Sequence, residues 1–300
     1  MVLVIVFVFF GLELIVGWRS GVGAWMQEFQ KPVVRQLDLS GISSPYAILI
    51  QAGSGKTVGD LNGEEQMYPA SLTKMMTAIV AIEELKDLDQ EITLTQEMFA
   101  GLYEQDATQA GFQPGETVRA IDLLYGVMLP SGAECCIALS YAIAGSEQGF
   151  VDLMNQKAVK LGMDGTHFCD STGLHNPDHY STAKRYGSSF YSMRCKNDTF
   201  REIAESPWHS TPGTNLHPDG ITYYSTMFKN LSETSVTGGK ILGGKTGFTN
   251  AAGSCLASFA EIEGVEYILV TAGAMDGGTP NITDAVTVYN RLGEAAQALK

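Results

Sequence analysis

Three short stretches of this chain carry hydroxyl and amino side chains in an arrangement suited to acyl transfer. They begin at Ser71, Ser131 and Lys245. A serine hydroxyl is a weak nucleophile at neutral pH unless a neighbouring base takes its proton. Ser71 and Lys74 are three residues apart in a segment whose apolar residues recur with helical period, so they share one helix face about one turn apart. We therefore predict that Ser71 is a nucleophile and that Lys74 is its base.

The start of this helix also offers a place for negative charge. Pro69 precedes Ser71, and the first backbone N–H groups of a helix have no partner within the helix. These N–H groups, together with the positive end of the helix dipole, stabilise an oxyanion that develops beside Ser71. Taken alone, Ser71 and Lys74 are better interpreted as a helix cap and a surface lysine. The other two stretches change that interpretation.

The second and third stretches lie at the ends of predicted elements. Ser131 precedes a helix expected over residues 135–144. The run Lys245–Gly247 precedes two strands expected at residues 254–262 and 265–274, which a two-residue turn joins. At the ends of elements, side chains from distant parts of a chain can converge. The pattern therefore predicts one site that contains both serines and both lysines.

Together the three stretches resemble the S-x-x-K, S-x-N and K-T-G motifs of the penicillin-binding-protein and serine β-lactamase superfamily. The closer resemblance is to the low-molecular-mass D-alanyl-D-alanine carboxypeptidases of peptidase family S11, and it covers roughly residues 40 to 295. The segments that carry it are Tyr68–Thr77, Leu129–Gly132, stretches within Leu153–His175, and Gly244–Gly253.

This resemblance implies an activity and three catalytic residues. It implies a serine-type D-Ala-D-Ala carboxypeptidase that removes the terminal D-alanine from peptidoglycan stem peptides through an ester on Ser71. By the same resemblance, Lys74 takes the Ser71 proton and Ser131 passes it to the leaving nitrogen. The partners implied are a stem peptide ending in D-Ala-D-Ala and β-lactams, which would bind covalently as inhibitors.

The resemblance also implies which residues bind the substrate. Lys245 and Thr246 are expected to hold its terminal carboxylate, with Gly247 completing the third motif. The backbone N–H groups of Ser71 and Phe248 are expected to hold the oxyanion. No metal and no cofactor is implied.

One position departs from the family pattern. Ala133 stands where the second motif usually ends in asparagine. An alanine methyl makes no hydrogen bond, and losing one such bond in a dry site costs about 1–3 kcal/mol. Glu134 projects about 100° further round the helix, so it is not an obvious replacement, whereas water or a main-chain carbonyl could fill the gap. A catalytically impaired peptidoglycan- or penicillin-binding protein is therefore one alternative function.

Two further alternatives use different chemistry. Class A serine β-lactamases carry a glutamate that activates water, but Phe150 occupies the corresponding position before Leu153. A serine β-lactamase is thus a less favoured reading. A zinc peptidase would need a set of metal ligands, and His175 and His179 are separated by Pro177 without the H-E-x-x-H pattern.

Composition limits the setting in which this chemistry takes place. The chain has 300 residues, a formal net charge of −14 and no basic stripe that would neutralise phosphates, so we expect no nucleic-acid partner. The apolar run at residues 2–16 favours a signal peptide or N-terminal membrane anchor over residues 1–24, with a catalytic domain over residues 25–300. We expect an extracytoplasmic protein, either secreted or in contact with the membrane through its N-terminus.

If the protein is exported, Cys169 and Cys195 could form a disulfide, although two free thiols are the alternative.

The order of predicted elements indicates an α+β fold. Strands are expected at residues 46–51, 57–60 and 240–274, with helices between them and a final helix at 283–299. This order favours one antiparallel sheet, completed by both ends of the chain and flanked by helices, with an inserted helical subdomain. The resemblance names this layout the β-lactamase/transpeptidase-like fold. We expect residues 207–219 to form a loop and no C-terminal β-domain.

Overall fold

The computed structural model describes residues 34–300, apart from the side chains of Arg194 and Cys195. The signal or anchor predicted over residues 1–24 lies outside this range, and the disulfide considered above involves the Cys195 side chain, which is not among those described. Cys169 is a free thiol. Over residues 34–300, we find no helix with the length and apolar character needed to cross a membrane.

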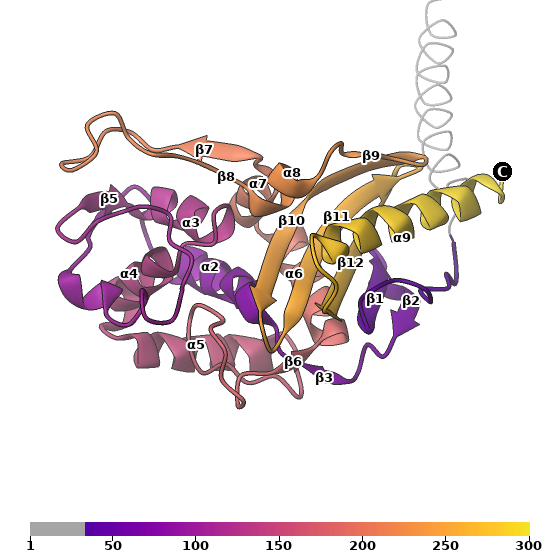
Figure 1. The fold of residues 1–300 in the computed structure, drawn as a ribbon, viewed down its shortest axis with the longest axis horizontal. Helices are drawn as coiled ribbons and strands as arrows, with labels where there is room; N and C mark the ends of the chain where they lie inside the picture. Colours follow the sequence, from indigo (N-terminus) through magenta and orange to yellow (C-terminus); the bar gives the residue numbers. More distant parts are fainter. Residues whose placement is uncertain (1–33) are drawn as a thin grey trace, which may run out of the picture.

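A six-stranded antiparallel sheet forms the centre of the molecule (Figure 1). The strand order is β2-β1-β12-β11-β10-β9. Strand β1 is paired with β12, so that Ile48 lies opposite Val270, and the sheet joins both ends of the described chain as predicted. The strands are β1 (Tyr46–Gln51), β2 (Lys56–Leu61), β9 (Ser235–Val236), β10 (Gly239–Thr249), β11 (Gly253–Ile262) and β12 (Val265–Ala274).

Helices cover both faces of this sheet (Figure 1). Successive residues of β1 point to opposite sides, so Ile48 and Ile50 join one apolar cluster while Ala47 and Leu49 join another. The first cluster lies against α6 (Ala183–Lys196) and the second against α9 (Pro280–Gln297). Both faces are apolar because both are buried, which explains the nearly unbroken apolar run of β1.

Of the remaining helices, the short α8 packs on the same face of the sheet as α9, and the others form the inserted subdomain to one side of the sheet (Figure 1). Helix α2 lies at its centre, and every residue from Thr73 to Ala81 is buried. Helix α4 begins at Ala133, two residues earlier than predicted, and ends at Gly145, whose φ of 73° is the left-handed conformation that favours glycine. These elements are η1 (Ala70–Leu72), α2 (Thr73–Glu84), η2 (Gln96–Phe99), α3 (Ala120–Met128), α4 (Ala133–Ala144), α5 (Glu147–Lys160), α7 (Asp198–Glu205) and α8 (Thr226–Asn230).

The prediction of a loop over residues 207–219 is partly wrong. Its first part is strand β7 (Trp208–Ser210), which pairs with β8 (Thr222–Tyr224) in a hairpin over α3 (Figure 1). The hairpin is held by tertiary contacts, since the His209 ring stacks on Tyr125 with centroids 3.8 Å apart and its Nε2 lies 2.7 Å from Asp122. Four more short strands pair as β3 (Gln66–Met67) with β6 (Ser181–Thr182) and β4 (Glu91–Thr93) with β5 (Thr117–Arg119).

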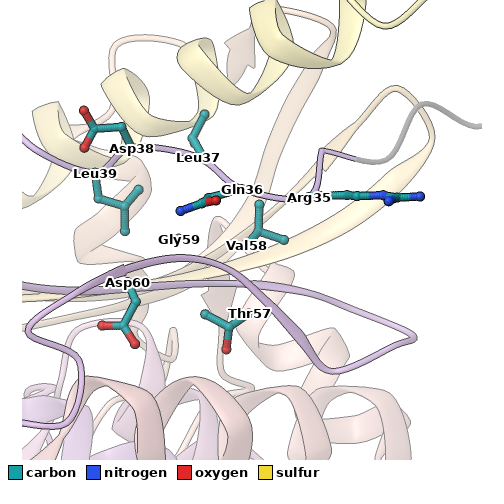
Figure 2. A pocket seen from close by; sticks show the side chains of 9 residues that line it. All are labelled: Arg35, Gln36, Leu37, Asp38, Leu39, Thr57, Val58, Gly59 and Asp60. Atoms are coloured by element: carbon teal, nitrogen blue, oxygen red, sulfur yellow. The ribbon is translucent and has the colours of Figure 1, made fainter.

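A hollow of about 640 Å³ lies between the segment Arg35–Leu39 and strand β2 (Figure 2). Strand β2 is at one edge of the sheet, and three strands separate it from β10, which carries Lys245. This hollow is therefore not at the site predicted from the sequence.

Candidate active site

Ser71 lies on the 3₁₀ turn η1, directly before α2. Its neighbour Ala70 has a φ of 48°, a conformation that non-glycine residues adopt only rarely. Strand β10 runs so close to this turn that a Cβ on Gly247 would lie 3.0 Å from the Ser71 nitrogen. The glycine of the third motif thus lets the strand approach the backbone of the nucleophile turn.

Lys74 lies in the first turn of α2, and its buried side chain turns back towards Ser71. The distance from Lys74 Nζ to Ser71 Oγ is 3.3 Å. Lys74 Nζ also donates a hydrogen bond of 2.6 Å to the main-chain oxygen of Thr172. The spacing of Ser71 and Lys74 therefore predicted their contact correctly.

Ser131 and Lys245 form a second hydroxyl–amine pair. Lys245 Nζ donates to Ser131 Oγ at 3.0 Å and to the Thr246 oxygen at 2.8 Å. Ser131 is buried with a φ of 72°, so a strained backbone holds its hydroxyl at this place. Burial, and next the charge of Lys74, hold the pKa of Lys245 well below its ordinary value. An anion bound beside this amine would offset the unfavourable burial of its charged form.

The other residues of the third motif lie along the exposed side of β10. Thr246 Oγ1 is 2.5 Å from Thr226 Oγ1, which fixes the hydroxyl at the edge of the site. Phe248 is 63% exposed, so its ring faces solvent while its backbone remains in the strand.

The side chain at position 133 is buried and leaves little room for a larger one. Ala133 is only 1% exposed, and its N–H donates to the Thr108 oxygen at 2.8 Å. Glu134 does not replace the missing amide, because its Oε1 accepts from the Ala110 and Gly111 N–H groups. Burial raises the pKa of Glu134. Lys74 Nζ instead donates a hydrogen bond to the Thr172 carbonyl, an acceptor that does not depend on residue 133.

Three functional neighbours escaped the sequence reasoning. Thr172 contributes only its main-chain oxygen, and Thr226 acts through Thr246; neither has a local signal of its own. His179 was examined only as a metal ligand. Its ring lies 3.2 Å from Asp170 Oδ2 and 2.9 Å from Thr73 Oγ1. Within residues 34–300 we find no group of three or more His, Cys, Asp or Glu side chains able to hold a metal ion.

Comparison with known proteins agrees with this geometry. Residues 33–276 match the family model of D-alanyl-D-alanine carboxypeptidases, Peptidase_S11. The chain is 38% identical over 148 residues to the D-alanyl-D-alanine carboxypeptidase DacC of Escherichia coli, which covers 46% of this chain and 36% of that protein. It is 30% identical over 241 residues to DacF of Bacillus subtilis, which covers 76% of this chain and 57% of that protein. The chain thus spans about a third to somewhat over half of the length of these relatives.

Solved structures share the fold. A mutant of the Streptomyces K15 DD-transpeptidase superposes with a TM-score of 0.75 at 26% identity, covering 85% of this chain and 98% of that chain. A D-alanyl-D-alanine carboxypeptidase from Mycobacterium tuberculosis superposes with a TM-score of 0.74 at 24% identity, covering 88% and 95%, which supports the fold alone. The two paired serines and lysines, the α+β architecture and the family-model match together show that this chain belongs to the D-alanyl-D-alanine carboxypeptidase family, peptidase family S11.

Proposed function

We propose that this protein is a serine-type D-Ala-D-Ala carboxypeptidase that acts through an acyl-enzyme on Ser71. One observation carries the proposal: two buried lysines each contact one serine hydroxyl, Lys74 with Ser71 and Lys245 with Ser131. A nucleophile with an adjacent amine, beside a second amine suited to a carboxylate, is a set of groups that can cleave a C-terminal peptide bond.

The proposed reaction has two stages. Ser71 Oγ attacks the carbonyl carbon between the last two D-alanines while Lys74 takes the hydroxyl proton. The bond to the terminal D-alanine nitrogen then breaks. Ser131 gives its hydroxyl proton to that nitrogen and receives in return the proton that Lys74 took from Ser71. In the second stage water attacks the ester and gives a proton to Lys74, which returns it to the Ser71 oxygen as the shortened stem peptide leaves.

The third motif would bind and polarise the substrate. Lys245 and Thr246 would hold the terminal carboxylate, and the lowered pKa of Lys245 supports a site that is completed by an anion. The N–H groups of Ser71 and Phe248 are the proposed oxyanion donors, and the approach of Gly247 to the Ser71 nitrogen supports this by bringing the two backbones together.

A β-lactam would acylate Ser71 by the same attack. Its leaving amine stays tethered to the acyl group, so we expect a persistent ester, whereas a serine β-lactamase would hydrolyse the ester rapidly. Since stem peptides are part of the cell wall, we propose that the protein acts outside the cytoplasm, with residues 1–24 as a signal or membrane anchor.

Transpeptidation is a second candidate. The matched Streptomyces K15 structure is named a DD-transpeptidase, and the two reactions differ only in whether water or an amine attacks the ester. Adding a D-amino acid to the assay separates them, because a transpeptidase would incorporate the added amine into the product.

The test is a stem pentapeptide assay with mass-spectrometric detection of D-alanine, run beside labelling with a fluorescent penicillin. Ser71→Ala should abolish both signals, while Ser54→Ala, on an exposed turn, should leave both unchanged. Labelling that persists in Ser71→Ala or moves to Ser131 would refute the nucleophile assignment. Labelling without D-alanine release in the unmodified protein would favour the impaired binding protein.

A further inference from the structure

The segment Asp170–Gly173, here called the crossing segment, lies across the first turns of α2. Its contacts with that helix recur at residues three or four apart. The Thr77 hydroxyl donates to the Ser171 oxygen at 2.6 Å, and Lys74 Nζ donates to the Thr172 oxygen at 2.6 Å. At its end, a Cβ on Gly173 would lie 1.9 Å from the Ala70 oxygen, so only glycine fits there. The crossing segment therefore touches one face of η1 and α2, the face that bears the lysine.

One peptide unit in this segment determines where Lys74 points. The Thr172 C=O and the Gly173 N–H are the two ends of the same planar peptide group and point in opposite directions when the bond is trans. The Gly173 N–H donates to Asp170 Oδ1 at 2.6 Å, and the Thr172 N–H and hydroxyl donate to the same oxygen at 2.7 and 2.8 Å. By anchoring the N–H end, Asp170 turns the carbonyl end towards Lys74 Nζ.

The other oxygen of Asp170 is tied to α2 through a histidine. Asp170 Oδ2 lies 3.2 Å from His179 Nδ1, and the ring donates to this oxygen when it carries its proton on Nδ1. On its far side, His179 Nε2 lies 2.9 Å from the hydroxyl of Thr73, the residue next to Lys74. His179 is 2% exposed, so its ring is shielded from water, whereas the Asp170 side chain is 21% exposed. Burial raises the pKa of Asp170, but hydrogen bonds led by that from His179 outweigh it and leave the pKa lowered.

We propose that Asp170 and His179 are positioning residues for the general base, a proposal that rests on the acyl-transfer function above. Asp170 holds the Thr172–Gly173 peptide so that its carbonyl takes an N–H of Lys74. A neutral amine has two N–H groups and one lone pair, so fixing one N–H leaves the lone pair free to face Ser71 Oγ. His179 fixes the distance between this peptide and α2. The arrangement also explains how Lys74 keeps an oriented amine although residue 133 offers it no amide.

The test separates positioning from folding by measuring two constants for a chromogenic β-lactam in stopped flow: the dissociation constant of the initial complex and the rate of acylation. A reacting group displaced by about 1 Å can lose about a hundredfold in rate. Asp170→Ala should therefore slow acylation by at least about tenfold and leave initial binding unchanged. Asp170→Asn keeps an oxygen for the Gly173 N–H, so it should recover most of the rate.

A matched control comes from a second aspartate–histidine pair, in which again one of the two side chains is buried. Asp122 on α3 lies 2.7 Å from His209 on β7, and neither element carries Ser71 or Lys74. Asp122→Ala should lower the melting temperature and leave the acylation rate within about twofold, which thermal unfolding and stopped flow would show together. A loss of acylation in Asp122→Ala equal to that in Asp170→Ala would mean that general destabilisation explains both, and would overturn the proposal.

If Asp170→Ala does not fold, His179→Gln carries the test. Glutamine can reach the Thr73 hydroxyl but releases Asp170, so acylation should slow by about threefold to tenfold without a change in initial binding. Wild-type acylation by a folded His179→Gln or Asp170→Ala protein would refute the positioning role. Failure of the unmodified protein to acylate at Ser71 would refute the proposed function itself, and mass spectrometry of the labelled peptide distinguishes these results.

Discussion

Lys245 is a cationic residue in a place that disfavours its charge. It is 1% exposed, and burial followed by the charge of Lys74 lowers its pKa. An ammonium is needed to bind a carboxylate, so binding should be complete below the lowered pKa and be lost as pH rises through it. The lowered pKa also affects stability. Between the lowered pKa and the ordinary lysine pKa, the unfolded chain binds more protons than the folded protein, so the free energy of unfolding rises with pH over that range.

This predicts an alkaline loss of binding well below the ordinary lysine pKa of about 10.4. The measurement is the dissociation constant of a non-reactive peptide ending in D-alanine carboxylate, determined from pH 6 upward with Ser71→Ala protein. Lys245→Arg should remove this pH dependence, since a guanidinium stays charged throughout the range. If the protein that keeps Lys245 bound the peptide with constant affinity up to the ordinary lysine pKa, the prediction would be contradicted.

Ala133 gives a second prediction at the scale of one side chain. The position is 1% exposed and the turn of chain that holds Thr108 lies against its N–H, so little space is left for an amide. Overpacking a closed site costs about 1–3 kcal/mol, so Ala133→Asn should lower the acylation rate even though asparagine is usual in the family. Stopped-flow acylation and D-alanine release would measure it, with Ala133→Ser as the smaller control. A higher rate in both assays for Ala133→Asn would show that the alanine only removes the hydrogen bonds of an asparagine and that the site has not adapted to it.

At the scale of elements, two glycines in left-handed conformation should behave differently. Gly145 ends α4 with a φ of 73° and open space around its missing Cβ. Gly145→Ala should therefore cost only the conformational strain, about 1–2 kcal/mol, and leave acylation unchanged. Gly173 has a φ of 80° and would also collide with the Ala70 oxygen. Gly173→Ala should lose more stability, by a further 1–3 kcal/mol or so, and most of the acylation rate.

Chemical denaturation and stopped flow would measure both glycine variants. Equal stability losses in the two proteins, or normal acylation by Gly173→Ala, would argue against the close contact between the crossing segment and η1.

The elements also show what the sequence could predict. Long periodic segments were predictable: β1 matches the expected residues 46–51, and the turn at Glu263 and Gly264 has the two positive φ values that a two-residue hairpin needs. Strand β7 was missed because three residues give no alternation, and because its stability comes from Tyr125 and Asp122, far away in the sequence.

The site divides in the same way. Ser71 and Lys74 were predictable because helical spacing alone brings them together. The contact of Lys74 with Thr172 was not predictable, because a main-chain carbonyl accepts a hydrogen bond whichever side chain the residue carries. The bridge from Asp170 through His179 to Thr73 depends on a tertiary fold that spacing does not contain.

At the scale of the whole molecule, one carboxylate ties the chain before β1 to the last helix. Asp284 on α9 is 3% exposed and accepts hydrogen bonds from the Ser43 N–H, the Ser44 N–H and the Ser44 hydroxyl. Asp284→Ala would leave these donors without an acceptor, and since an unsatisfied buried group costs about 1–3 kcal/mol, we expect a loss of about 3 kcal/mol. Urea denaturation would measure it, with the exposed Asp276→Ala as control. A loss as small as that of the control would show that water replaces the carboxylate.

The pairing of β1 with β12 has a consequence for the time at which the protein becomes reactive. Ile48 is made early and Val270 late, so a chain growing from its N-terminus carries Ser71 and Lys74 long before their sheet can close. Contacts so distant along the chain form slowly, because the intervening loop must be closed first. Until β10 docks, Ser71 and Lys74 lack Lys245 beside them, and if the proposed roles hold, a nascent or truncated chain should be inert to penicillin. Covalent labelling by penicillin would then report that folding has been completed.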